Sequence, residues 1–383
     1  MSGNFSDIRE QIRALCAGFP GAYWREHDRA RTYPREFVEA LTTGGWLACL
    51  IPEAYGGSGL GLREAAAIME EIQASGCNGA AAHAQMYTMG TILRHGSDAQ
   101  KTSYLPEIAA GRLRLQAFGV TEPESGTDTL SLRTRAVRDG DHYIVNGSKV
   151  WTSRAEHSDL MLLLARTTAR EDAPSRTEGL SVFIVDLREA RGKGIEIRPI
   201  PTMINHATCE VFIDNLRVPA ANLIGEEGKG FRYILDGMNA ERILIGAECI
   251  GDARWFVARA GDYAKTRKVF NRPIGQNQGV QFPIARAYAQ MRAAALMVER
   301  AAALFDAGER CGEEANLAKL LASEASWEAA DTCMQTFGGY GFAEEFDVER
   351  KFREARLYRT APISTNMILS YVAEHVLGLP RSY

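Results

Sequence analysis

Apolar residues recur at helical spacing through the first third of the chain. The segments EFVEALTTGGWLACL and EAAAIMEEIQ place apolar side chains three and four positions apart, a pattern typical of amphipathic helices. The segment between them, IPEAYGGSGLGL, is too rich in glycine for a helix and is expected to form a loop. The pattern predicts an all-helical first domain over residues 1–114.

Near Leu115 the helical spacing gives way to short apolar runs. The runs HYIVNGSKVWTS, LMLLLART, LSVFIVDL, IEIRPI and CEVFIDNLRV are separated by Gly, Asn, Asp and charged residues, as is typical of successive strands. They predict a compact β domain over residues 115–226. Helical spacing resumes at about Phe231 and continues almost to the end, so a helical bundle is expected over residues 227–383.

The composition is that of a large globular protein. With 383 residues, of which 46% are hydrophobic and 24% charged, the chain can bury a core in two or three domains. The formal net charge of −4 gives no reason to expect nucleic acid or an anionic membrane as a partner. The seven cysteines are scattered and include no CxxC pair, so reduced thiols are expected rather than a disulfide framework or a metal site.

The N-terminus carries no pattern of a targeting segment. The segment MSGNFSDIREQIRAL is charged and lacks the apolar run of a secretory signal, and no stretch has the length of a membrane-spanning helix. A cytoplasmic location is therefore the expectation.

The segment AFGVTEPESGTDTLSLRTRA opens the predicted β domain and concentrates hydroxyl groups in a short, turn-rich stretch. Thr121, Ser125 and Thr127 could hydrogen-bond the polar edge of a ring, together with backbone N–H groups. On these residues alone, an ordinary polar loop is at least as good an interpretation as a ligand-binding loop.

Four segments of the chain together resemble, in order and spacing, the signatures of acyl-CoA dehydrogenases. They are TEPESGTD, VNGSKVWTS, RKVFNRPIGQNQGVQ and QTFGGYGFAEEFDVERKFREARLY. IPEAYGGSGL matches the N-terminal domain of that family, so the resemblance spans nearly the whole chain. It implies an α+β multidomain fold with an N-terminal α-helical domain, a middle β-barrel and a C-terminal four-helix bundle. It also implies an FAD-dependent oxidoreductase that converts an acyl-CoA thioester to a trans-2-enoyl-CoA.

The resemblance also implies which residues bind FAD, and an arginine among them suits a pyrophosphate because its planar fork makes paired hydrogen bonds. The implied FAD-binding residues are Phe118, Val120, Thr121, Thr127, Trp151, Ser153, Arg267, Phe270, Gln278, Gln335, Gly339, Ser364 and Asn366. Those from Arg267 to Gly339 would reach the cofactor from a neighbouring chain. A homo-oligomer, with a tetramer as the expectation, is therefore implied.

For the substrate, the resemblance implies that Arg242 binds the phosphopantetheine or pyrophosphate part of CoA, with Ser125 as a second substrate-binding residue. In isolation, Arg242 could equally form a surface ion pair. An electron-transfer flavoprotein is the implied electron acceptor.

The chain departs from the commonest family pattern at the catalytic base. Where many members carry a glutamate, LYRTAPIST places Pro362, which cannot accept a proton. The isovaleryl-CoA and long-chain enzymes instead carry the base on a bundle helix, and Glu241 of NAERILIG matches that place. Glu241 follows Met238 by three residues and precedes Ile245 by four, so it lies beside an apolar stripe where burial would raise its pKa. A structural ion pair is the alternative role.

Pro362 has a second consequence, because family members use the backbone N–H at this position to hydrogen-bond the thioester carbonyl and proline has none. Either Ala361 or Ile363 substitutes, or the chemistry differs. A flavoenzyme of the same fold with another reaction, such as an acyl-CoA desulfinase, an oxidase or a monooxygenase, is thus an alternative. So are a catalytically silent flavin or acyl-CoA-binding protein and a helical scaffold without flavin. The place of Glu241 hints at branched or longer acyl groups.

Overall fold

A computed structural model describes residues 5–381, except for the side chain of Ala81. The described residues fall into two compact units. The first unit comprises Met1–Ala30, Gly61–Gly79 and Asn239–Tyr383, and the second comprises Arg31–Leu60 and Ala80–Met238. The N-terminal helices are thus divided between the two units, and the domain boundaries after residues 114 and 226 remain predictions.

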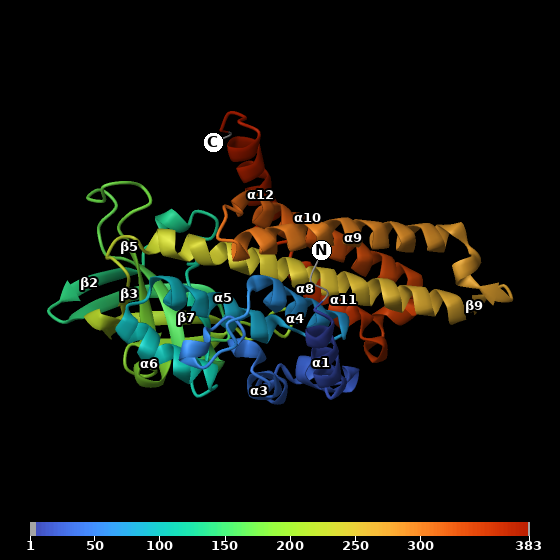
Figure 1. Cartoon of the computed structure of the whole chain (residues 1–383), viewed down its shortest axis with the longest axis horizontal. Coiled ribbons are helices and arrows are strands. Elements are labelled where there is room, and N and C mark those ends of the chain that lie inside the picture. Colours follow the sequence, from blue (N-terminus) through green and yellow to red (C-terminus); the bar gives the residue numbers. More distant parts are fainter. Residues whose placement is uncertain (1–4, 382–383) are drawn as a thin grey trace. The chain divides into compact units, whose positions relative to one another are not determined.

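The N-terminal part is helical, as predicted. Figure 1 shows its helices in blue to green, following the order of the sequence. Its α-helices are α1 (Ser6–Ala17), α2 (Gly21–Ala30), α3 (Arg35–Thr43), α4 (Leu62–Ala74), α5 (Ala80–His95) and α6 (Asp98–Ala109). The glycine-rich segment before α4 is an irregular loop with one short 3₁₀ turn, as expected. A Cβ atom on Gly57 would collide with the carbonyl oxygen of Ile51, so this loop requires glycine for close backbone approach.

The predicted β domain is confirmed as an eight-stranded sheet. Its strands are β1 (Leu115–Gly119), β2 (Arg135–Asp139), β3 (His142–Ser153), β4 (Leu160–Arg166), β5 (Leu180–Asp186), β6 (Ile195–Pro199), β7 (Thr208–Pro219) and β8 (Leu223–Ile224). The order is β6-β7-β3-β2-β4-β5-β8, and β1 pairs with β4 in parallel. A single parallel bridge between Arg135 and Arg166 joins β2 to β4.

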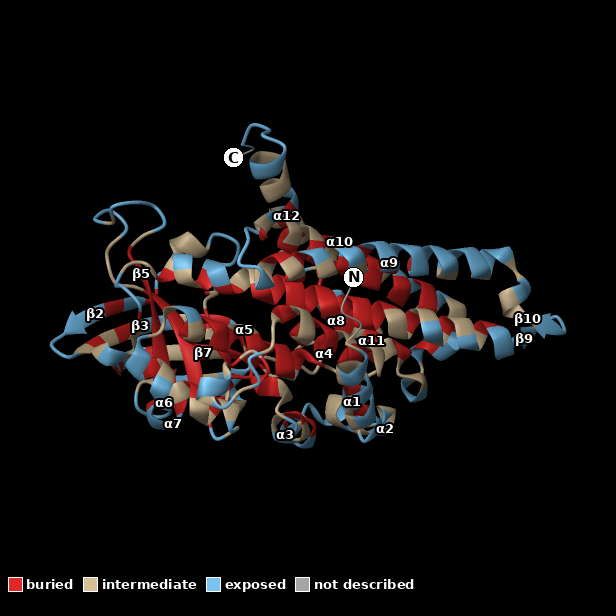
Figure 2. Cartoon of the chain, in the orientation of Figure 1, coloured by how far each residue is buried: buried red, intermediate tan, exposed pale blue. Residues whose placement is uncertain are grey.

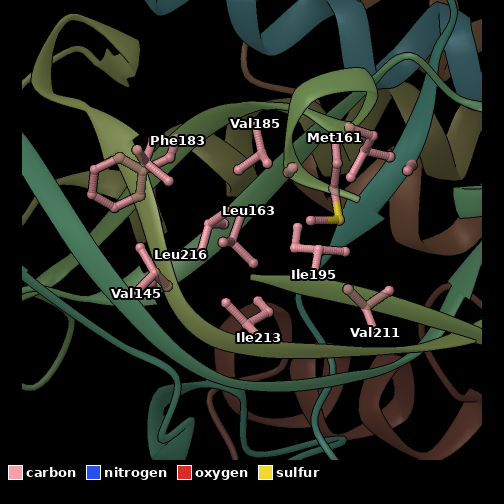
Figure 3. Close-up of a cluster of buried hydrophobic side chains, with 14 of the residues drawn as sticks. Val145, Met161, Leu163, Phe183, Val185, Ile195, Val211, Ile213 and Leu216 are labelled. Atoms are coloured by element: carbon pink, nitrogen blue, oxygen red, sulfur yellow. The ribbon is translucent and has the colours of Figure 1, made fainter. Parts of the chain in front are cut away.

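Strand β4 shows why its sequence is apolar at nearly every position. Met161 and Leu163 point into an apolar cluster with Val145, Phe183 and Ile213, which Figure 3 shows between the strands. The alternate residues of β4 belong to a second cluster that includes side chains of α5 and α6. A strand covered on both faces needs a continuous apolar run rather than an alternating one.

The predicted C-terminal helical bundle is also confirmed. Its helices are α8 (Gly230–Thr266), α9 (Gln278–Asp306), α10 (Gly312–Phe337), α11 (Val348–Leu357) and α12 (Thr365–Tyr371), with a small hairpin of β9 (Lys268–Val269) and β10 (Arg272–Pro273) after α8. A Cβ on Gly246 of α8 would lie 3.0 Å from Cγ2 of Val298 on α9, so the glycine lets these two helices approach closely. Figure 2 shows that one side of α9 is exposed along most of its length.

The described residues show neither a membrane-spanning helix nor a cluster of metal-ligating side chains. In this part of the chain, no helix has both the length and the apolar character that a membrane crossing requires. The same residues contain no group of three or more His, Cys, Asp or Glu side chains that could hold a metal ion.

Candidate functional site

The loop after β1 is tied to the end of β3. The backbone N–H of Val150 donates to the carbonyl oxygen of Thr121 at 2.9 Å, and the Nζ of Lys149 donates to the carbonyl oxygen of Val120 at 3.1 Å. Half-buried Phe118 lies in β1 just before this loop, and Trp151 directly follows Val150. The structure therefore brings together the two segments that the resemblance assigns to the flavin ring.

A buried ion pair holds this loop in place. The ammonium of Lys149, whose side chain is fully buried, lies 2.8 Å from a carboxylate oxygen of Glu122. The same carboxylate accepts the backbone N–H groups of Arg133 at 2.6 Å and Thr134 at 2.9 Å. Burial lowers the pKa of Lys149 to about 8 despite the attraction of Glu122. The carboxylate thus stays paired and ties both ends of the loop to β3.

The remaining polar groups of the loop differ in their roles. The Ser125 hydroxyl is engaged within the loop, because it donates to the carbonyl oxygen of Asp128 at 2.6 Å. Thr127 is exposed, and its hydroxyl has no partner among the described residues. Ser125 therefore shapes the loop, whereas Thr127 is available to a ligand.

The end of β3 carries groups that suit a flat ring with a polar edge. Trp151 is 58% exposed and has a φ of 59°, so its indole lies at the surface of its unit. Thr152 is buried, and its Oγ1 has no partner within the described part of the chain. Ser153 ends the strand and is half-buried. An exposed indole next to a hydroxyl group that bonds no described residue fits the isoalloxazine implied by the resemblance.

Glu241 and Arg242 are buried on α8, as the apolar stripe beside them predicted. They are 6% and 8% exposed, respectively. The Nη1 of Arg242 donates to Oδ1 of Asn239 at 2.8 Å, while its Nε is buried without a partner among residues 5–381. Burial lowers the pKa of Arg242, and the carboxylate of Glu241 is the strongest of the groups that oppose this shift. Arg242 is therefore a buried cation with unused hydrogen-bond donors, not a surface ion-pair residue.

A second buried cation lies near Glu241. Lys319 on α10 is fully buried, and its Nζ donates to the carbonyl oxygen of Ile363 at 2.6 Å. Burial lowers the pKa of Lys319 to about 8, and the carboxylate of Glu241 is among the groups that oppose this shift. Two cations thus favour the ionised carboxylate of Glu241. Sequence analysis missed Lys319, although a lysine among the small residues of NLAKLLASE was a possible signal.

The turn between α11 and α12 contains the departure at Pro362. The N–H groups of Thr360 and Ala361 both donate to the carbonyl oxygen of Leu357, at 2.9 and 3.0 Å. Pro362 has no N–H, and the N–H of Ile363 donates to no group in the described part of the chain. Of the two substitutes that the sequence allowed, the Ile363 N–H is therefore the available donor.

Ser364 and Asn366 follow that turn at the start of α12. The Oγ of Ser364 accepts the N–H of Met367 at 3.3 Å and so caps the helix, and Asn366 is exposed. The cap fixes the direction in which the chain leaves the turn.

The residues expected to act from a neighbouring chain are all exposed in the single chain. Phe270, at the tip of the β9–β10 hairpin, is 93% exposed, and the guanidinium of Arg267 lies 5.7 Å from the centre of the Tyr340 ring. The structure thus brings Arg267 next to the turn that contains Gly339. Gln278 starts α9 and Gln335 lies near the end of α10.

Comparison with known proteins gives matches along the whole chain. Family models described as the N-terminal, middle and C-terminal domains of acyl-CoA dehydrogenase match residues 4–112, 117–216 and 228–377. The acyl-CoA dehydrogenase FadE12 of Mycobacterium tuberculosis is 36% identical over 387 residues, which cover 99% of this chain and 98% of that protein. The 3-(aryl)acrylate reductase of Clostridium sporogenes is 34% identical over 359 residues, which cover 92% of this chain and 94% of the reductase.

A solved structure extends the similarity to the fold. The glutaryl-CoA dehydrogenase in its complex with glutaryl-CoA superimposes with a TM-score of 0.91 at 29% identity, over 100% of this chain and 97% of that chain.

Proposed function

The chain belongs to the acyl-CoA dehydrogenase family of oxidoreductases, and on that premise we propose that it binds FAD and converts an acyl-CoA thioester to a trans-2-enoyl-CoA. Family members are flavoproteins that generally bind FAD. The observation that carries the proposal is the buried carboxylate of Glu241 near Arg242 and Lys319. A buried glutamate in reach of two cations can be ionised and ready to accept a proton.

The proposed flavin-binding residues fit the cofactor by their chemistry. Val120, Thr121 and Thr127 offer backbone and hydroxyl groups to a polar ring edge, and Trp151 offers an exposed indole to a ring face. When bound, FAD supplies the acceptor for the hydride that leaves the β carbon of the substrate. We assign the pyrophosphate and adenine ends to residues of a second copy, headed by Arg267, and the remaining contacts to Ser364 and Asn366.

Glu241 is proposed as the base that removes the α proton of the thioester. A carbon acid of this kind is too weakly acidic for a carboxylate unless its carbonyl oxygen receives hydrogen bonds as negative charge develops. The unpartnered N–H of Ile363 is our candidate for one of these donors. The unused donors of Arg242 suit the phosphopantetheine or pyrophosphate of CoA.

Pro362 keeps a second candidate function open. Because Pro362 removes the usual carbonyl donor, a family enzyme with another reaction, such as a desulfinase, an oxidase or a monooxygenase, is the second candidate. Anaerobic bleaching of the flavin absorbance by butyryl-, isovaleryl- and octanoyl-CoA tests the proposal. Bleaching with release of the enoyl-CoA supports dehydrogenation. A flavin-loaded protein that no ester bleaches would contradict it and would favour another reaction or a silent binder.

The partners follow from the same proposal. The apolar side chains of Phe270, Phe282 and Leu296 are exposed on the hairpin and on α9, which suits contact with a second copy. We propose that the protein forms a homo-oligomer, and that this oligomer is a tetramer, as the resemblance to the family implies. We also propose that an electron-transfer flavoprotein accepts the electrons of the reduced flavin. A cytoplasmic location also remains a proposal.

Replacing Arg267 with alanine should weaken FAD retention, because the variant loses the cation that we assign to the pyrophosphate of a neighbouring copy. The flavin-to-protein ratio after gel filtration measures the effect. Lys265→Ala is the matched control, since Lys265 is also cationic and exposed but pairs with Asp262. Equal flavin ratios in the two variants would remove Arg267 from the cofactor site.

Replacing Ile363 with proline should lower the rate of flavin reduction by about 10²–10³-fold, as is typical when one oxyanion donor is lost. The change removes an N–H that bonds no group in the described part of the chain. Ile363→Ala keeps the N–H while shortening the side chain, so it should retain most activity. Rapid-mixing absorbance measures both variants, and equal rates in the two would contradict the donor role.

A further inference from the structure

Lys319 is an unusual buried lysine, because a neutral carbonyl is the only hydrogen-bond partner of its ammonium among residues 5–381. The side chain is fully buried on α10 and donates to the Ile363 carbonyl oxygen at 2.6 Å. No carboxylate in the described part of the chain forms an ion pair with it. Removing an ammonium from water without a paired carboxylate is costly. A role that depends on this arrangement would explain why the fold keeps it.

The bond from Lys319 completes the fixation of the turn before α12. The N–H groups of Thr360 and Ala361 hold the start of the turn on the carbonyl oxygen of Leu357, and the hydroxyl of Ser364 caps the following helix. Lys319 holds the carbonyl of Ile363 between these two points. The Ile363 carbonyl belongs to the peptide group after this residue and the Ile363 N–H to the one before it. These bonds therefore fix the chain on both sides of the N–H and restrict its direction.

Lys319 also acts on the proposed base. Its surroundings include the carboxylate of Glu241, whose attraction favours the ammonium, and the guanidinium of Arg242, which disfavours it. Because the attraction between Lys319 and Glu241 is mutual, the ammonium favours the ionised carboxylate. One buried cation thus acts on the carbonyl donor and on the base.

We propose that Lys319 is a positioning residue for the dehydrogenation: by bonding the carbonyl of Ile363 it fixes this residue so that the Ile363 N–H, in the preceding peptide group, faces the thioester carbonyl. The inference rests on the proposed function. A merely structural role for Lys319 would instead stabilise the bundle without affecting the polarity of the bound carbonyl.

The test uses the flavin-loaded Lys319→Met variant, in which an apolar side chain of similar length replaces the lysine. We expect kcat to fall by about 10²-fold with a much smaller change in KM, because the lost interaction strengthens in the transition state. The infrared band of a bound trans-2-enoyl-CoA with a labelled carbonyl should move to higher frequency, since the carbonyl is less polarised. Lys351→Met is the control, because Lys351 is equally buried in the same unit but bonds Asp252 and Gln73. This variant should be less stable, so it is measured on folded, flavin-loaded protein, where its kcat and carbonyl band should stay near those of the wild type.

A double-mutant cycle with Ile363→Pro separates positioning from structure. Once the Ile363 N–H is gone, loss of Lys319 should have little further effect through the donor, so the two changes should be strongly non-additive. Additive losses, an unmoved carbonyl band, or equal effects in the Lys351 control would overturn the proposal. If Lys319→Met does not fold, Lys319→Arg replaces it in the double-mutant cycle. The arginine keeps the positive charge but moves the N–H donors of the side chain away from the position of the lysine ammonium. A wild-type enzyme that no ester reduces would instead overturn the proposed function itself.

Discussion

Replacing Glu241 with glutamine is expected to slow flavin reduction by an acyl-CoA ester by about 10²–10⁴-fold, the usual contribution of a general base. The amide has nearly the same shape as the carboxylate but cannot take the α proton. The side chain is only 6% exposed, so bulk water has little access to act in its place. Flavin content should change little, but the melting temperature should fall, because the buried cations Arg242 and Lys319 lose a charge that attracts them. Anaerobic rapid mixing, on protein of equal flavin content, measures the effect.

Glu248→Gln provides the matched control. Glu248 lies two turns further along α8 and is fully buried, and its carboxylate accepts the Tyr358 hydroxyl at 2.8 Å. This change should affect stability but leave the reduction rate of the folded, flavin-loaded protein near that of the wild type. Full activity of Glu241→Gln would contradict the assignment of the base and leave Glu241 with a structural role beside Arg242.

The order of elements was predictable because hydrophobic periodicity is a local property. The run LMLLLART became β4 between two apolar clusters, and the glycine-rich segment before α4 became a loop. The burial of Glu241 was predictable for the same reason, since its neighbours three and four residues away are apolar. Each of these features depends only on residues close in the sequence.

The association of the helices was not predictable from that periodicity. Helix α4 belongs to one compact unit and α5 to the other, although the two are neighbours in the sequence. In α4 even Glu71 and Gln73 are buried, so the polar residues of this helix do not mark which side faces solvent. Periodicity shows that a face is buried but not what it packs against.

The buried lysines were missed because lysine normally indicates a solvated position. Lys149 and Lys319 are buried because groups distant in sequence, Glu122 and the Ile363 carbonyl, receive their ammonium groups. Such pairings depend on tertiary structure, and a single sequence does not reveal them. The choice between Ala361 and Ile363 likewise required the hydrogen bond from Ala361 to Leu357.

The largest expected effect on stability concerns another buried lysine, Lys351 of α11. Its ammonium lies 2.5 Å from a carboxylate oxygen of Asp252, 3.3 Å from one of Glu354 and 2.7 Å from the amide oxygen of Gln73. Lys351 and Asp252 are both fully buried. Replacing Lys351 with methionine should lower the free energy of unfolding by about 3–5 kcal/mol, because it leaves buried carboxylates without their cation.

This destabilisation should depend on pH in a defined direction. Burial raises the pKa of Asp252 to about 7, and Lys351 opposes the rise. Without Lys351 the pKa of folded Asp252 rises further above the unfolded value of about 3.9, so the variant loses stability as the pH increases towards that higher pKa. Near pH 5.5 Asp252 is protonated with or without Lys351, so the loss should be smaller there than at about pH 8.5.

Urea unfolding followed by circular dichroism at both pH values measures the loss. Adding Asp252→Asn to Lys351→Met should recover part of the stability, because a neutral amide no longer leaves an unpaired buried charge. The recovery should be greatest at the higher pH, where the carboxylate of Asp252 would otherwise have to ionise. A loss of equal size at both pH values, with no recovery in the double variant, would mean that Lys351 stabilises the bundle through packing of its methylene groups rather than through its charge.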